Sequence, residues 1–170
     1  ALDPKVYRKA VALLAESEFI DIFGVENSLT PAMDLFTKLG YLGLTCRLNT
    51  DAYLQQIGAG HLPHGAVAVA FSHSGSSADT VKALRLAKSH GAKTIAITNA
   101  IGAPLASWAD VTLLTGRDSH TIYGNAIFSR VADTALVDML YMGVILSGYG
   151  RFSTALDESG RMIRDRVFEN

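Results

Sequence analysis

The stretch at residues 66–80 constrains the fold of this chain most, because the spacing of its apolar residues changes within it. Residues 66–71 form a short apolar run with the length of a buried strand. From Ala78 onward, Val81, Leu84 and the pair Leu86 and Ala87 recur at helical spacing. A buried strand that turns directly into a helix is typical of folds with a parallel sheet.

The turn between this strand and this helix is rich in hydroxyl groups. Such a turn directs several backbone N–H groups and the positive end of the helix dipole to one place. Serine hydroxyls add donors that rotate to fit oxygen atoms, and a glycine lets the backbone approach a bound group. The sequence therefore predicts a phosphate site at Ser72, His73, Ser74, Gly75, Ser76 and Ser77. An ordinary serine-rich cap on a buried helix is the alternative.

Residues 72–80 resemble the signature of the SIS (sugar isomerase) domain, which reads Ser-x-Ser-Gly-x-Thr/Ser-x-Glu/Asp-Thr. The resemblance implies a phosphorylated sugar as the ligand. It also draws attention to a second turn, at residues 24–28, which follows an apolar strand at residues 19–23 and precedes a helix that starts near Thr30 and Pro31.

In SIS domains the turn after the first strand usually reads Gly-x-Gly-x-Ser. Gly24, Asn27 and Ser28 match that pattern, but Glu26 stands where glycine is usual. A carboxylate beside a phosphate is repelled. Glu26 therefore has three possible roles: a contact to the sugar end of the ligand, a general base, or a solvated side chain at a helix start. Gly24, Glu26, Asn27 and Ser28 join the predicted ligand site.

The whole chain alternates between strands and helices. Further strands are expected at residues 42–48, 93–98 and 111–114, and helices after Asp3, after Thr50 or Asp51, and up to His90. This order predicts an α/β fold with a five-stranded parallel sheet and helices on both faces, a flavodoxin-like sandwich of three layers. Ligands in such folds bind beyond the carboxyl ends of the strands, so both turns belong to one site. The resemblance places Gln55 and Gln56 near the pocket of a partner subunit, but a solvated face is the prediction for them.

The residues after the fifth strand form a polar loop and then a long apolar helix. Ser119, His120, Thr121 and Asn125 are candidates for covering the ligand, with His120 as a possible acid or base and a solvated loop histidine as the simpler alternative. The helix at residues 127–145 is apolar on more than one side, which predicts packing against both the sheet and a second copy of the chain. Residues 153–170 are expected to form a polar helix.

Composition narrows the class of protein. The chain has 170 residues, which suits one domain over residues 1–170, and its net charge of −1 offers no surface for nucleic acid. No apolar run is long enough to span a bilayer, and no secretory signal opens the chain. The single Cys46 suits a cytoplasmic protein. The five histidines lack metal-ligand spacing, so neither a metal nor a cofactor is predicted.

Residues 72–80, 84–88 and 128–132 look most like the C-terminal sensor domain of RpiR-type bacterial transcriptional regulators. The resemblance implies a non-catalytic domain that binds a sugar phosphate, acts as a homodimer or higher oligomer, and reaches DNA only through a helix-turn-helix domain absent from this chain. A sugar-phosphate aldose/ketose isomerase is the alternative. Glu26, His73 and His120 do not stand in the arrangement of such enzymes, and no catalytic residue is predicted. A pure interaction module is the third possibility.

Overall fold

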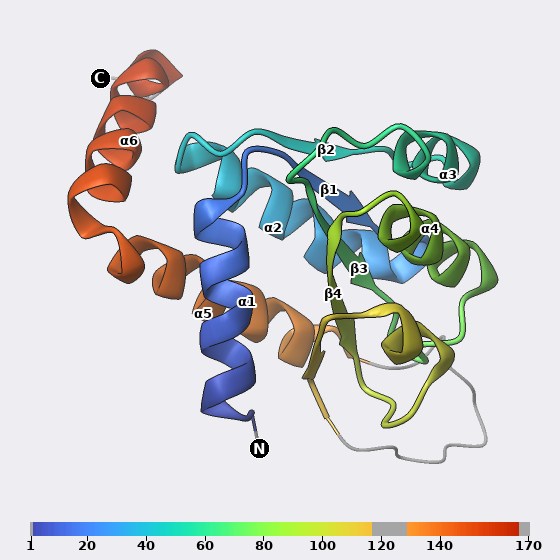
Figure 1. Ribbon diagram of the computed structural model, residues 1–170. Coiled ribbons are helices and arrows are strands. Elements are labelled where there is room, and N and C mark those ends of the chain that lie inside the picture. The colour runs from blue at the N-terminus through green and yellow to red at the C-terminus, as the bar shows by residue number, and fades with distance from the viewer. Residues whose placement is uncertain (1, 117–128, 167–170) are drawn as a thin grey trace.

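The computed structural model describes residues 2–116 and 129–166 and has a single sheet at its centre (Figure 1). Its five strands pair in parallel in the order β2-β1-β3-β4-β5. This arrangement confirms the predicted fold class. The strands are β1 (Ile20–Phe23), β2 (Cys46–Leu48), β3 (Val67–Phe71), β4 (Lys93–Thr98) and β5 (Val111–Leu114).

Helices cover both faces of the sheet (Figure 1). One face packs against α1 (Pro4–Glu16), α2 (Leu29–Tyr41) and α5 (Val131–Ser147). The other face packs against α4 (Ala78–Ser89), with α3 (Ala52–Ala59) beside it. Shorter or more peripheral elements complete the chain: α6 (Tyr149–Met162), η1 (Glu26–Ser28), η2 (Pro104–Trp108) and η4 (Arg164–Arg166).

The apolar side chains of β3 differ in size between the two faces of the sheet. Val67, Val69 and Phe71 belong to the core beneath α1, α2 and α5. Ala68 and Ala70 belong to the core beneath α4. Because alternate residues of a strand point to opposite faces, this run places large side chains on one face and small ones on the other. The small face leaves room for α4 to pack closely.

The predicted strand at residues 42–48 is shorter in the structure, where only β2 is extended. Leu42 caps α2, and Gly43 has a φ of 74°. The Leu44 amide then donates to the Leu39 carbonyl at 3.2 Å. Residues 42–44 therefore complete the end of a helix rather than begin a strand, although their apolar pattern is the same.

The C-terminal helices also differ in extent from the prediction. The predicted helix at residues 127–145 corresponds to α5, which begins two residues after the described chain resumes at residue 129 and continues to Ser147; residues 127 and 128 lie outside the described residues. The predicted polar helix begins earlier than expected, as α6, and the two helices meet at Gly148 with a bend of 117°. No single helix in the described part is long and apolar enough to cross a membrane; the bent pair of α5 and α6 passes only on length and composition.

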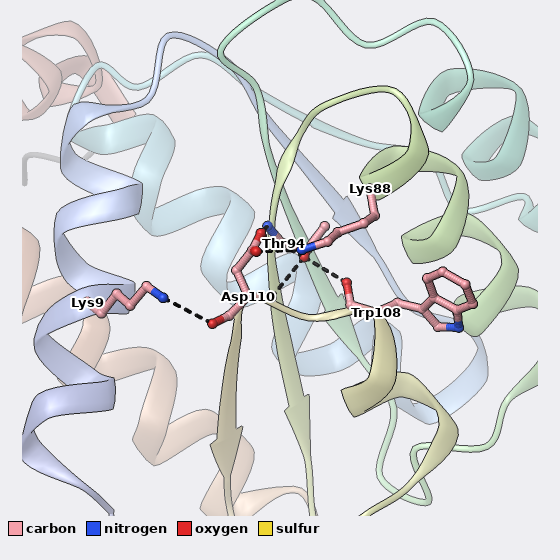
Figure 2. Close-up of polar contacts among 5 residues, drawn as sticks. All are labelled: Lys9, Lys88, Thr94, Trp108 and Asp110. Carbon is pink, nitrogen blue, oxygen red and sulfur yellow. Dashed lines mark hydrogen bonds and ion pairs between the residues drawn. The ribbon is translucent and has the colours of Figure 1, made fainter.

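A cluster of polar contacts around Asp110 ties four elements together at the amino edge of the sheet (Figure 2). The Asp110 carboxylate accepts hydrogen bonds from the Thr94 amide, at 2.9 Å, and from Lys88 Nζ. Its backbone carbonyl accepts from Lys9 Nζ at 3.3 Å, and the Thr94 hydroxyl donates to the Trp108 carbonyl at 2.7 Å. The cluster joins α1, α4, β4 and η2 around Asp110, which directly precedes β5, far from the predicted phosphate site.

We expect Asp110→Asn to lower the free energy of unfolding at pH 7 by about 1–3 kcal/mol, since the amide replaces a charged acceptor. Partial burial raises the pKa of Asp110, but Lys88 and the Thr94 amide outweigh it, so the pKa lies below its ordinary value. A depressed pKa contributes stability above the unfolded-state value of about 3.9, and this contribution is lost as the pH falls through the folded-state pKa.

Urea denaturation of the wild type and Asp110→Asn at pH 7 and pH 3 measures this effect. The gap between the two proteins should narrow at pH 3. Asp157→Asn, on the exposed surface of α6, is the matched control and should shift the midpoint little at either pH. If Asp110→Asn is destabilised by the same amount at pH 7 and at pH 3, the charge of the Asp110 carboxylate contributes nothing to stability.

Candidate functional site

The turns after β1 and β3 meet at the carboxyl edge of the sheet and form one pocket of about 300 Å³. The strand order reverses between these two strands, as in other folds that bind ligands at this place. Most of the sequence-predicted site residues line the pocket: Glu26, Asn27, Ser28, Ser72, His73, Ser74 and Ser77. We call residues 72–77 the serine turn and residues 24–28 the Glu26 turn.

Three predicted residues are not on the pocket wall, and two of them are glycines that shape the turns. Gly75 has a φ of 63°, and a Cβ there would lie 2.8 Å from Thr98 Oγ1 and closer still to Ala103. Its amide donates to the Ser72 carbonyl at 3.0 Å. A Cβ on Gly24 would lie 3.1 Å from the Ser28 carbonyl oxygen. Ser76 is exposed, and its hydroxyl donates to the Ser74 carbonyl at 3.3 Å.

The serine turn brings hydroxyl groups to the start of α4. Ser77 is the N-cap residue of this helix, but its side chain makes no capping hydrogen bond to the helix backbone. The first N–H groups of a helix have no carbonyl partner within the helix. Together with the hydroxyls of Ser72, Ser74 and Ser77 on the pocket wall, they make a set of donors that suits an oxyanion.

The backbone conformation at Glu26 explains why the Gly-x-Gly-x-Ser pattern usually has glycine at this position. Glu26 has a φ of 52°, in the left-handed region that costs a residue with a Cβ about 1 kcal/mol or more. The side chain is exposed and lines the pocket. Ser28 is buried, whereas Asn27 is exposed. The Glu26 turn therefore carries a carboxylate toward the pocket at some cost in backbone strain.

Gln55 supports the Glu26 turn from behind, and the prediction of a solvated face for Gln55 and Gln56 is wrong. The Gln55 side chain is only 1% exposed. Its Oε1 accepts from the Gly24 amide at 3.2 Å, and its Nε2 donates to the Gly24 and Asn49 carbonyls, each at 2.7 Å. These bonds satisfy backbone groups that no neighbouring strand reaches. Gln56 Nε2 donates to Asp79 Oδ1 at 3.0 Å.

Two charged side chains on the pocket wall were not predicted as site residues. Asp79 lies in the first turn of α4, and Arg130 directly precedes α5. Nothing in the local sequence indicates that Arg130 meets the serine turn. Burial, and then the nearby charge of Arg130, lower the pKa of His73, while Asp133 acts in the opposite direction. These effects favour the neutral form of the His73 imidazole.

Four polar residues after β5 were predicted to cover the ligand. Ser119, His120, Thr121 and Asn125 lie outside the described residues. Within residues 2–116 and 129–166, no group of three or more His, Cys, Asp or Glu side chains is placed to hold a metal ion.

Comparison with known proteins agrees with this fold. The SIS domain family model matches residues 13–143, and the chain belongs to this family. An uncharacterized HTH-type transcriptional regulator of Caldanaerobacter subterraneus is 30% identical over 99% of this chain and 60% of its own length. The HTH-type regulator RpiR of Escherichia coli is 26% identical over 84% of this chain and 48% of its own length.

A solved structure provides the third comparison. The Vibrio vulnificus NanR protein complexed with ManNAc-6P has a TM-score of 0.91 and 25% sequence identity, and the match covers 99% of this chain and 63% of that one. The chain thus spans about half to two thirds of the length of these relatives. The expected similarity to the effector-binding domain of RpiR-type regulators is confirmed.

Proposed function

We propose that this chain is a non-catalytic sensor domain that binds a phosphorylated sugar and belongs to an RpiR-type transcriptional regulator. The observation that carries the proposal is the convergence of the serine turn, the start of α4 and the Glu26 turn on one pocket. The serine turn and the helix start hold the phosphate. Asn27, Ser28 and Glu26 contact the sugar. The NanR complex with ManNAc-6P supports a phosphosugar as the ligand class.

The remaining properties follow from this role. Residues 1–170 act as one SIS domain without a resident cofactor or metal, and the regulator contacts DNA through a helix-turn-helix domain outside this chain. The regulator works in the cytoplasm as a homodimer or higher oligomer. Exposed apolar side chains on α5, among them Met142 at 50% and Leu146 at 69%, provide a surface for the second copy. Binding shifts the population of conformations that position the DNA-binding domains.

A thermal-shift panel of sugar phosphates and their dephosphorylated parents tests the proposal, with product analysis on every compound that stabilises the protein. Stabilisation by a phosphorylated sugar that is recovered unchanged is the expected result. Conversion of that compound to its ketose or aldose isomer would establish the alternative, a sugar-phosphate isomerase, which needs an acid and a base at the sugar carbons. No stabilisation by any compound would overturn the proposal.

We expect the double variant Ser74→Ala with Ser77→Ala to lose roughly a hundredfold or more in affinity for the sugar phosphate, since two donors to a charged oxygen are removed. Both hydroxyls lie on the pocket wall. Ser76→Ala is the matched control because Ser76 is in the same turn but exposed. Isothermal titration calorimetry measures the affinities. Equal affinity of the double variant and the control would remove the serine turn from the site.

Glu26→Gly is expected to lower the affinity for the preferred sugar phosphate by roughly tenfold, because hydrogen bonds from hydroxyls to a carboxylate are lost. Affinity for inorganic phosphate should not fall. Relief of the left-handed conformation and the greater freedom of glycine in the unfolded chain nearly cancel, so stability should change by about 0.5 kcal/mol or less. Calorimetry and urea denaturation measure the two effects. Unchanged affinity for the sugar phosphate would show that Glu26 is only solvated.

A further inference from the structure

The charges on the pocket wall do not suit a phosphate without one particular side chain. Glu26 and Asp79 both contribute carboxylates to the wall. The serine hydroxyls and the backbone N–H groups of the serine turn and α4 carry no formal charge. Among the residues that the structure describes, Arg130 is the only Lys or Arg on this wall. The balance of charge for a bound phosphate therefore depends on Arg130.

Arg130 is placed where its charge acts strongly. Its side chain is 14% exposed, and it stands at the N-cap position of α5. Charges away from bulk water interact more strongly than charges on an open surface. The Arg130 guanidinium is near enough to His73, in the serine turn, to depress the pKa of that imidazole. Arg130 thus reaches the turn that is proposed to hold the phosphate.

The ion pair of Arg130 with Asp133 is loose. Arg130 Nε and Asp133 Oδ2 are 3.9 Å apart, beyond hydrogen-bond distance, and the Asp133 side chain is 8% exposed. The same chain contains a close pair for comparison. Arg47 meets Asp21 at 3.0 Å and 2.6 Å through two nitrogens. The Arg130–Asp133 pair therefore lacks the two-pronged geometry of the Arg47–Asp21 pair.

We propose that Arg130 binds the phosphate group of the sugar phosphate, and that the Asp133 carboxylate competes with the phosphate for the guanidinium. This inference rests on the proposed function and names the charged group that the serine turn lacks. Arginine binds phosphate through paired, charge-assisted hydrogen bonds. Arg130 directly precedes α5, so the phosphate is bound jointly by the start of α4 and the start of α5. The ligand thereby connects two helices that lie on opposite faces of the sheet.

The experiment compares the wild type with Arg130→Gln, Arg130→Lys and Asp133→Asn. Each protein is titrated with inorganic phosphate, with ManNAc-6P and with unphosphorylated ManNAc, at low and high KCl. For Arg130→Gln we expect roughly a ten- to hundredfold loss of affinity for the phosphate-bearing compounds and a weaker dependence on salt. The affinity of Arg130→Lys should lie between those of the wild type and Arg130→Gln, because lysine keeps the charge but lacks the paired N–H donors of arginine.

Asp133→Asn separates a binding role from a structural one. If Arg130 binds the phosphate, removal of the competing carboxylate charge should tighten phosphate binding by about threefold or more. If the ion pair only holds the fold, Asp133→Asn should weaken binding as Arg130→Gln does, and this result would overturn the inference. Arg85→Gln, which removes an equal charge from the exposed face of α4, is the control and should leave the affinity unchanged.

The outcomes distinguish this inference from the proposed function. If the wild type binds inorganic phosphate or ManNAc-6P and Arg130→Gln binds them equally well, the inference is wrong and the proposed function stands. If the wild type binds neither of these and no sugar phosphate of the wider panel, both fail. Urea denaturation of each variant verifies that a lost affinity does not come from an unfolded domain.

Discussion

Replacing Arg47 with alanine should lower the free energy of unfolding by about 3–5 kcal/mol, the cost of leaving a buried charge without its partner. Asp21 lies in β1 and is 1% exposed. Its carboxylate accepts from Arg47 Nε at 3.0 Å and from Nη2 at 2.6 Å. Burial raises the pKa of Asp21 even though the hydrogen bond and charge of Arg47 lower it. The interaction with Arg47 therefore does not fully offset the cost of burying the Asp21 carboxylate.

A double variant tests this explanation. Asp21→Asn in the Arg47→Ala background removes the buried charge and should recover part of the lost stability, whereas independent effects would add to a larger loss. Urea denaturation at pH 7 measures all the variants. A loss below about 1 kcal/mol in Arg47→Ala would mean that water reaches the carboxylate and that the pair behaves like a surface ion pair.

The sheet and both turns of the site could be predicted because their signals are local. The run before Ser72 has the length of a buried strand, and the apolar spacing becomes helical after Ala78. Once strands and helices alternate, the rule that ligands bind beyond the carboxyl ends of the strands brings the two turns together. The positions of Glu26, Ser72 and Ser74 on the pocket wall agree with this reasoning.

Gln55 and Arg130 could not be predicted because their roles depend on contacts across the chain. Gln55 bonds to Gly24, which lies 31 residues earlier, and its neighbours in sequence do not show that α3 covers this turn. Arg130 reaches the pocket from the start of α5, which packs on the face of the sheet opposite to α4. A single glutamine or arginine in a sequence is equally compatible with a solvated surface.

The end of α2 shows a second kind of limit. Gly40 and Gly43 are both within reach of the helix end, and either could supply a left-handed residue. The structure places the positive φ of 74° at Gly43, after the helix has continued through Gly40 to Tyr41. Helix propensity does not separate these two positions. Packing of the following residues against the core decides between them, and Leu42 is 2% exposed.

Gly75→Ala should destabilise the domain by about 2–5 kcal/mol, because backbone strain and a steric clash add. The φ of 63° is unfavourable for any residue with a Cβ, and the new methyl group would lie 2.8 Å from Thr98 Oγ1. Thr98 is fully buried in β4, so it has little room to move. The Gly75 carbonyl also accepts from the Leu105 amide at 2.9 Å, which fixes the turn against η2.

Gly65→Ala is the matched control for Gly75→Ala. Gly65 has a φ of 79°, but a Cβ there would meet nothing within 4 Å. Gly65→Ala should therefore be destabilised only by backbone strain, by about 1–2 kcal/mol, and should keep its affinity for the sugar phosphate. Gly75→Ala should also bind the sugar phosphate more weakly at a temperature where it stays folded, since the serine turn must shift to accept the methyl group. Equal losses of stability in the two variants would show that this clash is absorbed without cost, and normal binding by Gly75→Ala would separate the shape of the turn from its function.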